Sequence, residues 1–371
     1  MTNWPGPTKF SRRAVVGGAL AAAAATRIAP ARAQSDPMKA LVTGAQAEGA
    51  VVVDGPAVDV VREYVSQEFQ RAYGIPVTYI PTTNSTSGAR VRAERSAGKF
   101  LLDVLVAGGD TPTMTYLPSG WLDRVEPILI APDVLDKTKW RDGHLWYEDE
   151  AHTILRTQSG VTPMLVVNVK LVKPGEVTTW KSLLDPKWQG KIVAKDPAVS
   201  GAGTSLIALL YLQFGPDYVK RLYKDQQPVV SRDARQAMQF IANGTYPILI
   251  GPEPTEIVRF QKLGYPIVPV FPADAPGILS GSNGLISLVN KAPHPNAAKL
   301  FINWIAGRGP QKKLAEARLT VSLRTDVKYA DDLPAWVFPQ KGAKYVDTYD
   351  YAFVTTQRDA AMTKARALLG E

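Results

Sequence analysis

Residues 50–109 read AVVVDGPAVDVVREYVSQEFQRAYGIPVTYIPTTNSTSGARVRAERSAGKFLLDVLVAGG and contain three apolar runs separated by two segments with helical spacing. The first run, Ala50–Pro56, is β-branched and ends at a Gly-Pro turn signal, and the apolar spacing of Val58–Gly74 suits a helix that its last glycine closes. The runs Ile75–Pro81 and Phe100–Gly109 repeat the strand pattern. Between them we expect a polar loop, Thr82–Gly88, that opens another helix through Arg95. This order predicts a mostly parallel sheet that is covered by helices.

A second α/β pattern begins near residue 162 and predicts a second lobe. The strand-like segments Thr162–Val172 and Gly190–Pro197 are followed by the helix-like segment Asp233–Gly244. A buried strand at Asn283–Asn290 and an amphipathic helix at His294–Gly307 come later. With 371 residues and 45% apolar content, the chain is long enough to form two cores.

The N-terminus has the pattern of an export signal. A short apolar run, Ala14–Thr26, follows the basic start Ser11–Arg13 and precedes the triplet Ala31–Ala33. The run is shorter than the roughly twenty residues that a permanent membrane span needs. Because the serine and its two arginines resemble a twin-arginine signal, we interpret residues 1–33 as a signal for export of a folded protein to the periplasm. We expect no membrane span after its removal.

Charge and cysteine content narrow the class of protein. The formal charge of +9 falls to +4 without residues 1–33, because this segment holds five basic residues and no acidic one. The basic run Ala89–Lys99 is interrupted by Glu94 and has no aromatic residue, so we interpret it as a solvated helix face and expect no nucleic-acid partner. The absence of cysteine excludes disulfides and thiolate zinc sites.

Signals for an enzyme are weak along the whole chain. The histidines of HLWYEDEAH, His144 and His152, lie eight residues apart, whereas a helical zinc pair lies four apart, and we interpret this stretch as a solvated connection. The stretch GAGTS, Gly201–Ser205, lacks the last glycine of a nucleophile elbow and the lysine of a phosphate loop. We therefore expect a protein that is not an enzyme and has no cofactor.

The stretch DPAVSGAGTSLIALLYL, Asp196–Leu212, joins tiny polar residues to an apolar run that predicts a buried helix. Small residues let a ligand approach the main chain, and unpaired N–H groups at a helix N-terminus favour a negative charge. Glycine and serine also fill ordinary turns. The residues by themselves leave both interpretations open, an anion site and a turn.

Three longer stretches resemble one protein family. They are NVKLVKPGEVTTWKSLLDPKWQGKIVAKDPAVSGAG (Asn168–Gly203), APHPNAAKLFINWIAGRGPQ (Ala292–Gln311) followed by RLTVSLRTDV, and FLLDVLVAGGDTPTMTYLPSGWLDRVEP (Phe100–Pro127). They resemble periplasmic solute-binding proteins of ABC importers, in the branch that includes the ferric-ion binders. The resemblance implies a two-lobed type II periplasmic binding fold with solute in the cleft. We place the first lobe at residues 34–160 and 276–330 and the second at residues 161–275 and 331–371.

The ferric-ion binders also imply a set of ligands, which this chain lacks. Their histidine and glutamate positions fall at about Ala57 and Gly108, and no Tyr-Tyr pair occurs near Gly251–Glu256 or elsewhere. Ferric ion needs anionic oxygen ligands, so we expect no metal. The family's anion-binding Ser-Gly-Ala turn is retained. It corresponds to Ser200, Gly201 and Ala202.

We therefore expect a monomeric receptor that binds a small anionic organic solute, with a phosphate, phosphonate or carboxylate group, and delivers it to an ABC importer permease. The alternatives are a ferric-ion or ferric-complex receptor and an exported hydrolase. Asp110 is a candidate for recognising a hydroxyl or ammonium group, and Tyr116 and Trp121 are the nearest aromatic candidates. Besides the Ser200–Ala202 turn, the candidate ligand-binding residues are Thr204, Ser205, Ser85, Thr86, Gly108, Gly109, Asp110, Glu253 and Thr255.

Overall fold

The computed structural model describes residues 36–82, 84–148, 150–198, 202–329 and 333–370. Residues 37–371 make up one unit of the chain, and residues 1–36 make up another. The export signal expected at residues 1–33 lies outside the described residues and stays a prediction. No helix of the described part is long and apolar enough to cross a membrane.

The first lobe is built on the larger of the sheets that the described residues form. Its strands, in order across the sheet, are β2 (Val77–Thr82), β1 (Val51–Pro56), β3 (Val104–Ala107), β14 (Leu285–Val289), β6 (Ile154–Arg156) and β5 (Leu145–Trp146), and β4 (Leu122–Asp123) pairs with β14. Strand β1 is parallel to β2 and β3, which confirms the predicted βαβαβ unit. Strand β14 is antiparallel to β3 and β6, so the sheet is mixed and less parallel than expected.

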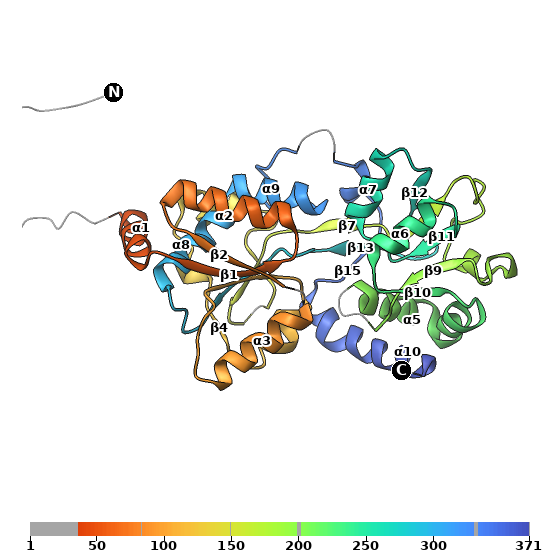
Figure 1. Ribbon diagram of the computed structural model, residues 1–371, viewed down its shortest axis with the longest axis horizontal. Helices are drawn as coiled ribbons and strands as arrows, with labels where there is room; N and C mark the ends of the chain where they lie inside the picture. The colour runs from red at the N-terminus through yellow and green to blue at the C-terminus, as the bar shows by residue number, and fades with distance from the viewer. Residues whose placement is uncertain (1–35, 83, 149, 199–201, 330–332, 371) are drawn as a thin grey trace, which may run out of the picture. The chain divides into compact units, whose positions relative to one another are not determined.

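Helices cover both faces of this sheet, and Figure 1 shows α2 and α9 on one face and α3 on the other. The first-lobe helices are α1 (Pro37–Glu48), α2 (Asp59–Tyr73), α3 (Asn84–Ser96), α4 (Pro132–Leu135), α8 (Pro295–Ile305) and α9 (Arg308–Arg318). Helix α2 ends at Gly74 with φ 74°, as its sequence predicts. Helix α3 begins inside the segment expected to be a loop at residues 82–88. The buried Ser87 hydroxyl donates to Asp54 Oδ2 at 2.5 Å and so holds this helix on the end of β1.

The second lobe has its own sheet and core. Its strands, in order, are β10 (Val229–Ser231), β9 (Ile192–Lys195), β11 (Ile248–Ile250), β8 (Leu165–Asn168) and β12 (Ile267–Val270). The helices around it are α5 (Ala202–Lys220), α6 (Ala234–Ala242), α7 (Pro254–Lys262) and α10 (Asp359–Leu369). Helix α5 bends at Gly215, where the backbone is not helical. The expectation of two α/β lobes is confirmed.

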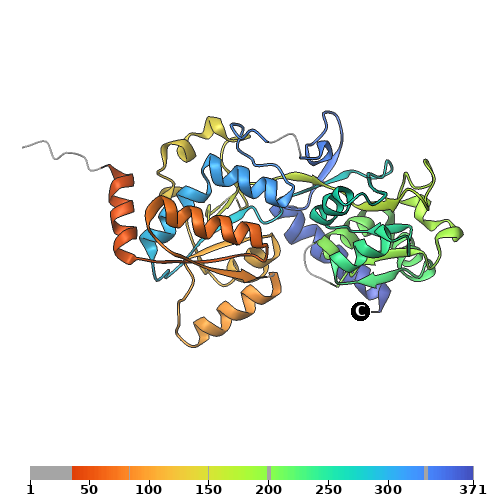
Figure 2. The same ribbon diagram turned by 45° about the horizontal axis from the view of Figure 1, so that its top comes forward.

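A small sheet lies between the lobes, as Figures 1 and 2 both show. Its order is β15 (Tyr345–Asp347), β13 (Gly277–Ser280) and β7 (Gly160–Thr162). Strand β7 carries the chain from β6 into β8, and β13 carries it back from β12 into β14. The returning chain enters the first sheet antiparallel to β3, which explains the mixed strand directions. After β15, a π-helical turn at Phe353–Arg358 leads into α10, which packs against α5.

Asp196 directly follows β9 and makes several buried contacts. This buried carboxylate accepts hydrogen bonds from Ala198 N at 2.8 Å and Arg232 Nε at 2.6 Å. Burial raises the pKa of Asp196, but these two partners outweigh it and leave the pKa below its ordinary value. Gly203 lies directly against the Asp196 carbonyl, with no room for a Cβ. The glycine at position 203, in the first turn of α5, is therefore also a packing requirement.

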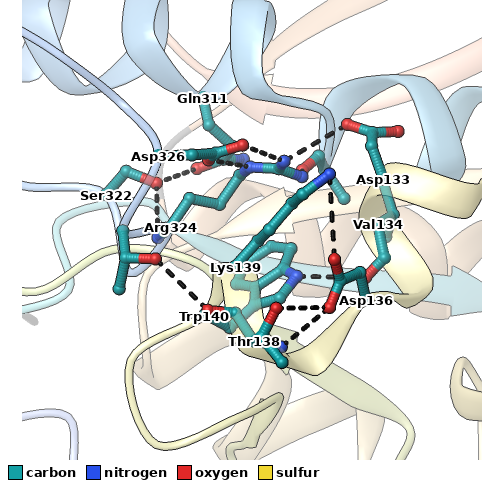
Figure 3. Close-up of polar contacts among 12 residues, drawn as sticks. Asp133, Val134, Asp136, Thr138, Lys139, Trp140, Gln311, Ser322, Arg324 and Asp326 are labelled. Atoms are coloured by element: carbon teal, nitrogen blue, oxygen red, sulfur yellow. Dashed lines mark hydrogen bonds and ion pairs between the residues drawn. The ribbon is translucent and has the colours of Figure 1, made fainter.

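A buried arginine ties the segment that follows α9 to Asp133 in α4, as Figure 3 shows. Arg324 is 3% exposed and pairs with Asp326 through Nε at 2.9 Å and Nη2 at 2.8 Å. Its Nη1 donates to Ala306 O at 3.2 Å, and Nη2 lies 3.3 Å from Asp133. The guanidinium also lies 5.3 Å from the ring centroid of Trp140. Because carboxylates and a carbonyl surround it, the arginine can be buried with its charge.

Substitution of Gly203 tests the packing of the turn. We expect Gly203→Ala to lower the free energy of unfolding by about 1–3 kcal/mol, because the new methyl group overlaps the Asp196 carbonyl. Gly309→Ala is the matched control, since nothing lies within 4 Å of a Cβ added there. Urea denaturation followed by circular dichroism measures both. Equal unfolding midpoints for the two variants would contradict this account of the turn.

The second prediction concerns Asp326. Its hydrogen bonds from Arg324 lower its pKa, so its stabilising effect is present above about pH 4 and is lost as the pH falls through the lowered pKa. We expect Asp326→Asn to cost about 1.5–3 kcal/mol at pH 7, and the difference from the unchanged protein to shrink on acidification. Urea denaturation between pH 3 and pH 7 measures this. The exposed Glu63→Gln is the control, and a difference that does not change with pH would refute the role of the pair.

Candidate solute site

A cavity of about 230 Å³ lies among the two lobes and the C-terminal segment. Its polar and charged lining residues come from each of these parts. The first lobe and the segment between β13 and β14 supply Asp110, Ser282, Asn283 and Arg318. The second lobe supplies Lys195, Ser205 and Glu253. The C-terminal segment supplies Thr348, Tyr349 and Arg358. Lys195 and Asp110 lie at or just beyond the ends of β9 and β3, where ligands of α/β sheets commonly bind.

The structure brings part of the predicted residue set together in this cavity. Gly108, Gly109, Asp110, Ser205 and Glu253 line it. Of the others, Thr86 lies in the first turn of α3, Thr204 is buried in α5 and Thr255 is half-buried in α7, and none of these three lines the cavity. Ser85 lies in α3 and Ala202 begins α5. Ser200 and Gly201 lie outside the described residues, so their role stays a prediction.

Two other sequence interpretations change. Tyr116 is fully buried and packs edge-on against Trp121, so it belongs to the first-lobe core and does not line the cavity. The stretch around His144 and His152 is not a solvated connection, because both rings are half-buried and flank Trp146 at centroid distances of 6.1 and 4.7 Å. The acidic residues of this stretch indicated exposure to solvent, but its aromatic residues pack against one another. Among the described residues, no cluster of histidine and carboxylate side chains could hold a metal ion.

A buried ion pair joins Asp110 to the C-terminal segment. The carboxylate accepts from Arg358 Nη1, and Arg358 Nη2 also donates to Asp359 Oδ1 at 2.9 Å. Burial alone lowers the pKa of Arg358, but the two carboxylates outweigh it and raise the pKa above its ordinary value. Asp110, which we expected to recognise a donor group of the solute, therefore has an arginine as its partner.

A second ion pair crosses the cavity, and here the first lobe supplies the arginine and the second lobe the carboxylate. Arg318 is the last residue of α9 in the first lobe, and Glu253 precedes α7 in the second. Their charged atoms Nη2 and Oε1 are 3.8 Å apart, and Arg318 Nε donates to Ser282 Oγ at 3.0 Å. Each lobe, counting the C-terminal segment with the second, thus contributes one arginine and one carboxylate to the cavity. The two pairs hold these four charges in place.

Lys195 carries the remaining charge of the cavity. Within the described part of the chain, no ion pair or hydrogen bond reaches its ammonium group. The lining contains the cations Lys195, Arg318 and Arg358 and the carboxylates Asp110 and Glu253, so its formal charge is +1. Ser205, which is 8% exposed, adds a hydroxyl from the second turn of α5. The site is suited to one negative group beside Lys195.

Tyr349 closes one side of the cavity. Its ring packs on Gly281, where a Cβ would overlap it. Its hydroxyl donates to Ser282 O and accepts from Gly109 N–H. Burial, the largest effect, raises the pKa of this phenol, so the neutral form is favoured.

Sequence reasoning missed the basic residues of the site. Lys195 ends the predicted strand in GKIVAKDP, and the rule that ligands bind beyond the carboxyl ends of strands could have found it. Arg318 begins the stretch RLTVSLRTDV, which was noted only for its resemblance. Arg358 lies in the C-terminal segment, and no local pattern indicates that it reaches a first-lobe carboxylate.

The sequence and the fold are similar to those of known proteins. The family of bacterial extracellular solute-binding proteins matches residues 55–312. The periplasmic binding protein AfuA from Actinobacillus pleuropneumoniae, solved with fructose-6-phosphate, superposes with a TM-score of 0.68 at 19% identity, over 87% of this chain and 99% of that chain. Iron-bound HitA from Pseudomonas aeruginosa superposes with a TM-score of 0.66 at 16% identity, over 86% of this chain and 99% of that chain.

In sequence, the chain is 22% identical over 326 residues to an uncharacterized protein of Haemophilus influenzae, over 86% of this chain and 90% of that protein. Because the solved structures are at most 19% identical to this chain, their similarity shows the fold alone. This fold is that of two-lobed periplasmic binding proteins. The family match spans more than half of the chain. The chain therefore belongs to the bacterial extracellular solute-binding proteins, which act outside the cytoplasm as the receptors of ABC importers.

Proposed function

We propose that this receptor binds a small organic anion, through a phosphate, phosphonate or carboxylate group, and delivers it to its permease from the periplasm. The observation that carries the proposal is Lys195, which lines the cavity and has no ion-pair partner within the described residues. A buried or half-buried cation without a partner favours a negative ligand, since charge-assisted hydrogen bonds are worth about 1.5–3 kcal/mol each.

The surroundings of Lys195 support the same conclusion. Ser205 lies near the beginning of α5, and the N-terminus of a helix carries a partial positive charge. The other two cations of the lining, Arg318 and Arg358, already face Glu253 and Asp110. The cavity therefore has a single uncompensated positive charge. This favours one anionic group over a polyanion.

The donor atoms of the cavity argue against ferric ion as the solute. Among the described lining residues, the tyrosine is Tyr349. Its hydroxyl already has hydrogen-bond partners in Ser282 O and the Gly109 backbone. The carboxylates Asp110 and Glu253 face arginines. A ferric site would need these oxygens as anionic ligands free to approach one point. The supported function is therefore binding of an anion without the metal.

The proposed mechanism is binding without turnover. The solute contacts both lobes only when they are close together, so it favours the closed form, and the permease recognises that form. Asp110–Arg358 and Arg318–Glu253 connect groups on opposite sides of the cavity and assist closure. We expect a monomer, because the two lobes that enclose the solute belong to one chain.

Substitution of Lys195 tests the proposed function. A thermal-shift screen of alkyl phosphates, phosphonates, carboxylates and ferric citrate first identifies an anion that raises the melting temperature. We expect Lys195→Gln to weaken binding of that anion about ten- to hundredfold in calorimetry, because it removes one charge-assisted hydrogen bond. The control is Lys170→Gln, which removes the same charge from an exposed position outside the cavity.

Two outcomes would refute the proposal. One is stabilisation by ferric citrate, with no response to any organic anion without iron, citrate included. The other is equal anion affinity for Lys195→Gln and Lys170→Gln, which would place the anion elsewhere.

A further inference from the structure

A second cavity, of about 160 Å³, lies next to the solute cavity. We name it the apolar annex. Its described lining is almost entirely hydrocarbon and aromatic, and Gln213 and Gln357 are its amide side chains. The other side chains that define it include Trp180, Leu209, Leu210, Phe214 and Phe353.

The annex and the solute cavity share a wall. Met164 and Leu206 line both cavities, and each is 4% exposed. Both side chains are apolar, and methionine is unbranched and adapts its shape easily. Two apolar side chains therefore lie between the cavities, and one of them, Met164, is of the type that adapts its shape.

The same two strands run past both cavities. Pro276 lines the annex and Ile278, two residues on, lines the solute cavity. Pro276 directly precedes β13. Val346 on β15 and Thr348 directly after it repeat this relationship, and β15 pairs with β13. Residues two apart on a strand lie on one face, about 7 Å from each other. One face of the β13–β15 pair thus extends from the solute cavity into the annex.

We propose that the solute is an amphipathic anion, whose negative group lies beside Lys195 and whose hydrocarbon or aryl group passes Met164 and Leu206 into the apolar annex. This inference rests on the proposed function and specifies the class of its solute. The apolar group lies about 7 Å along the strand from the cavity residues, which corresponds to a spacer of several bonds. A wholly polar anion would leave the annex without a role.

Two chain-length series test the proposal on the full mature protein. Calorimetry compares methyl, butyl and hexyl phosphate, and in parallel acetate, pentanoate and heptanoate. We expect the affinity to rise up to about fourfold for each methylene that enters the annex. The variant Ala275→Phe fills the annex from a half-buried lining position. We expect it to lose the gain in affinity with chain length and to bind methyl phosphate or acetate as the unchanged protein does. Ala275→Leu is a smaller filler, for use if the phenylalanine variant does not fold.

Ala273→Phe is the matched control, because residue 273 is exposed and does not line the annex. It should keep the dependence on chain length. Short anions that bind with no gain from longer chains would overturn the inference and leave the proposed function standing, as would a gain that survives in both Ala275 variants. Failure of every phosphate and carboxylate to bind would overturn the proposed function and this inference together.

Discussion

The ion pair between Asp110 and Arg358 is the contact on which the solute cavity depends. It connects the end of β3 in the first lobe with the segment that begins α10 on the second, and both side chains are buried. Two buried charges are tolerated because each faces the other and Arg358 also reaches Asp359. With these charges compensated, and with Arg318 facing Glu253, Lys195 is left as the charge that a ligand can use.

Much of the fold could be predicted from local patterns. The strands and helices of residues 51–107 follow from β-branched runs, helical spacing and the left-handed Gly74, all of which act between near neighbours in sequence. The beginning of α3 was misjudged because a hydrogen bond from Ser87 to Asp54, 33 residues away, stabilises a helix where the composition indicates a loop. The mixed strand directions also depend on a distant segment, β14.

The site was less predictable for the same reason. Gly108, Gly109 and Ser205 follow strands or begin helices, and local patterns indicate such positions. Arg318 and Arg358 enter the cavity because of contacts between residues that are far apart in the chain. The small residues at the beginning of α5 illustrate why the sequence left both an anion site and a turn open. Gly203 is needed for packing against Asp196 whether or not an anion binds nearby.

The position of β14 in the first sheet has a consequence for biosynthesis. This strand lies between β3 and β6, yet the ribosome makes it only after every strand of the second lobe's sheet. The first lobe therefore cannot complete its sheet while it emerges, and Tyr349 and Arg358, the last parts of the cavity, come later still. Such long-range pairing slows folding. A nascent chain of this receptor remains without a finished binding site until Arg358 has been made.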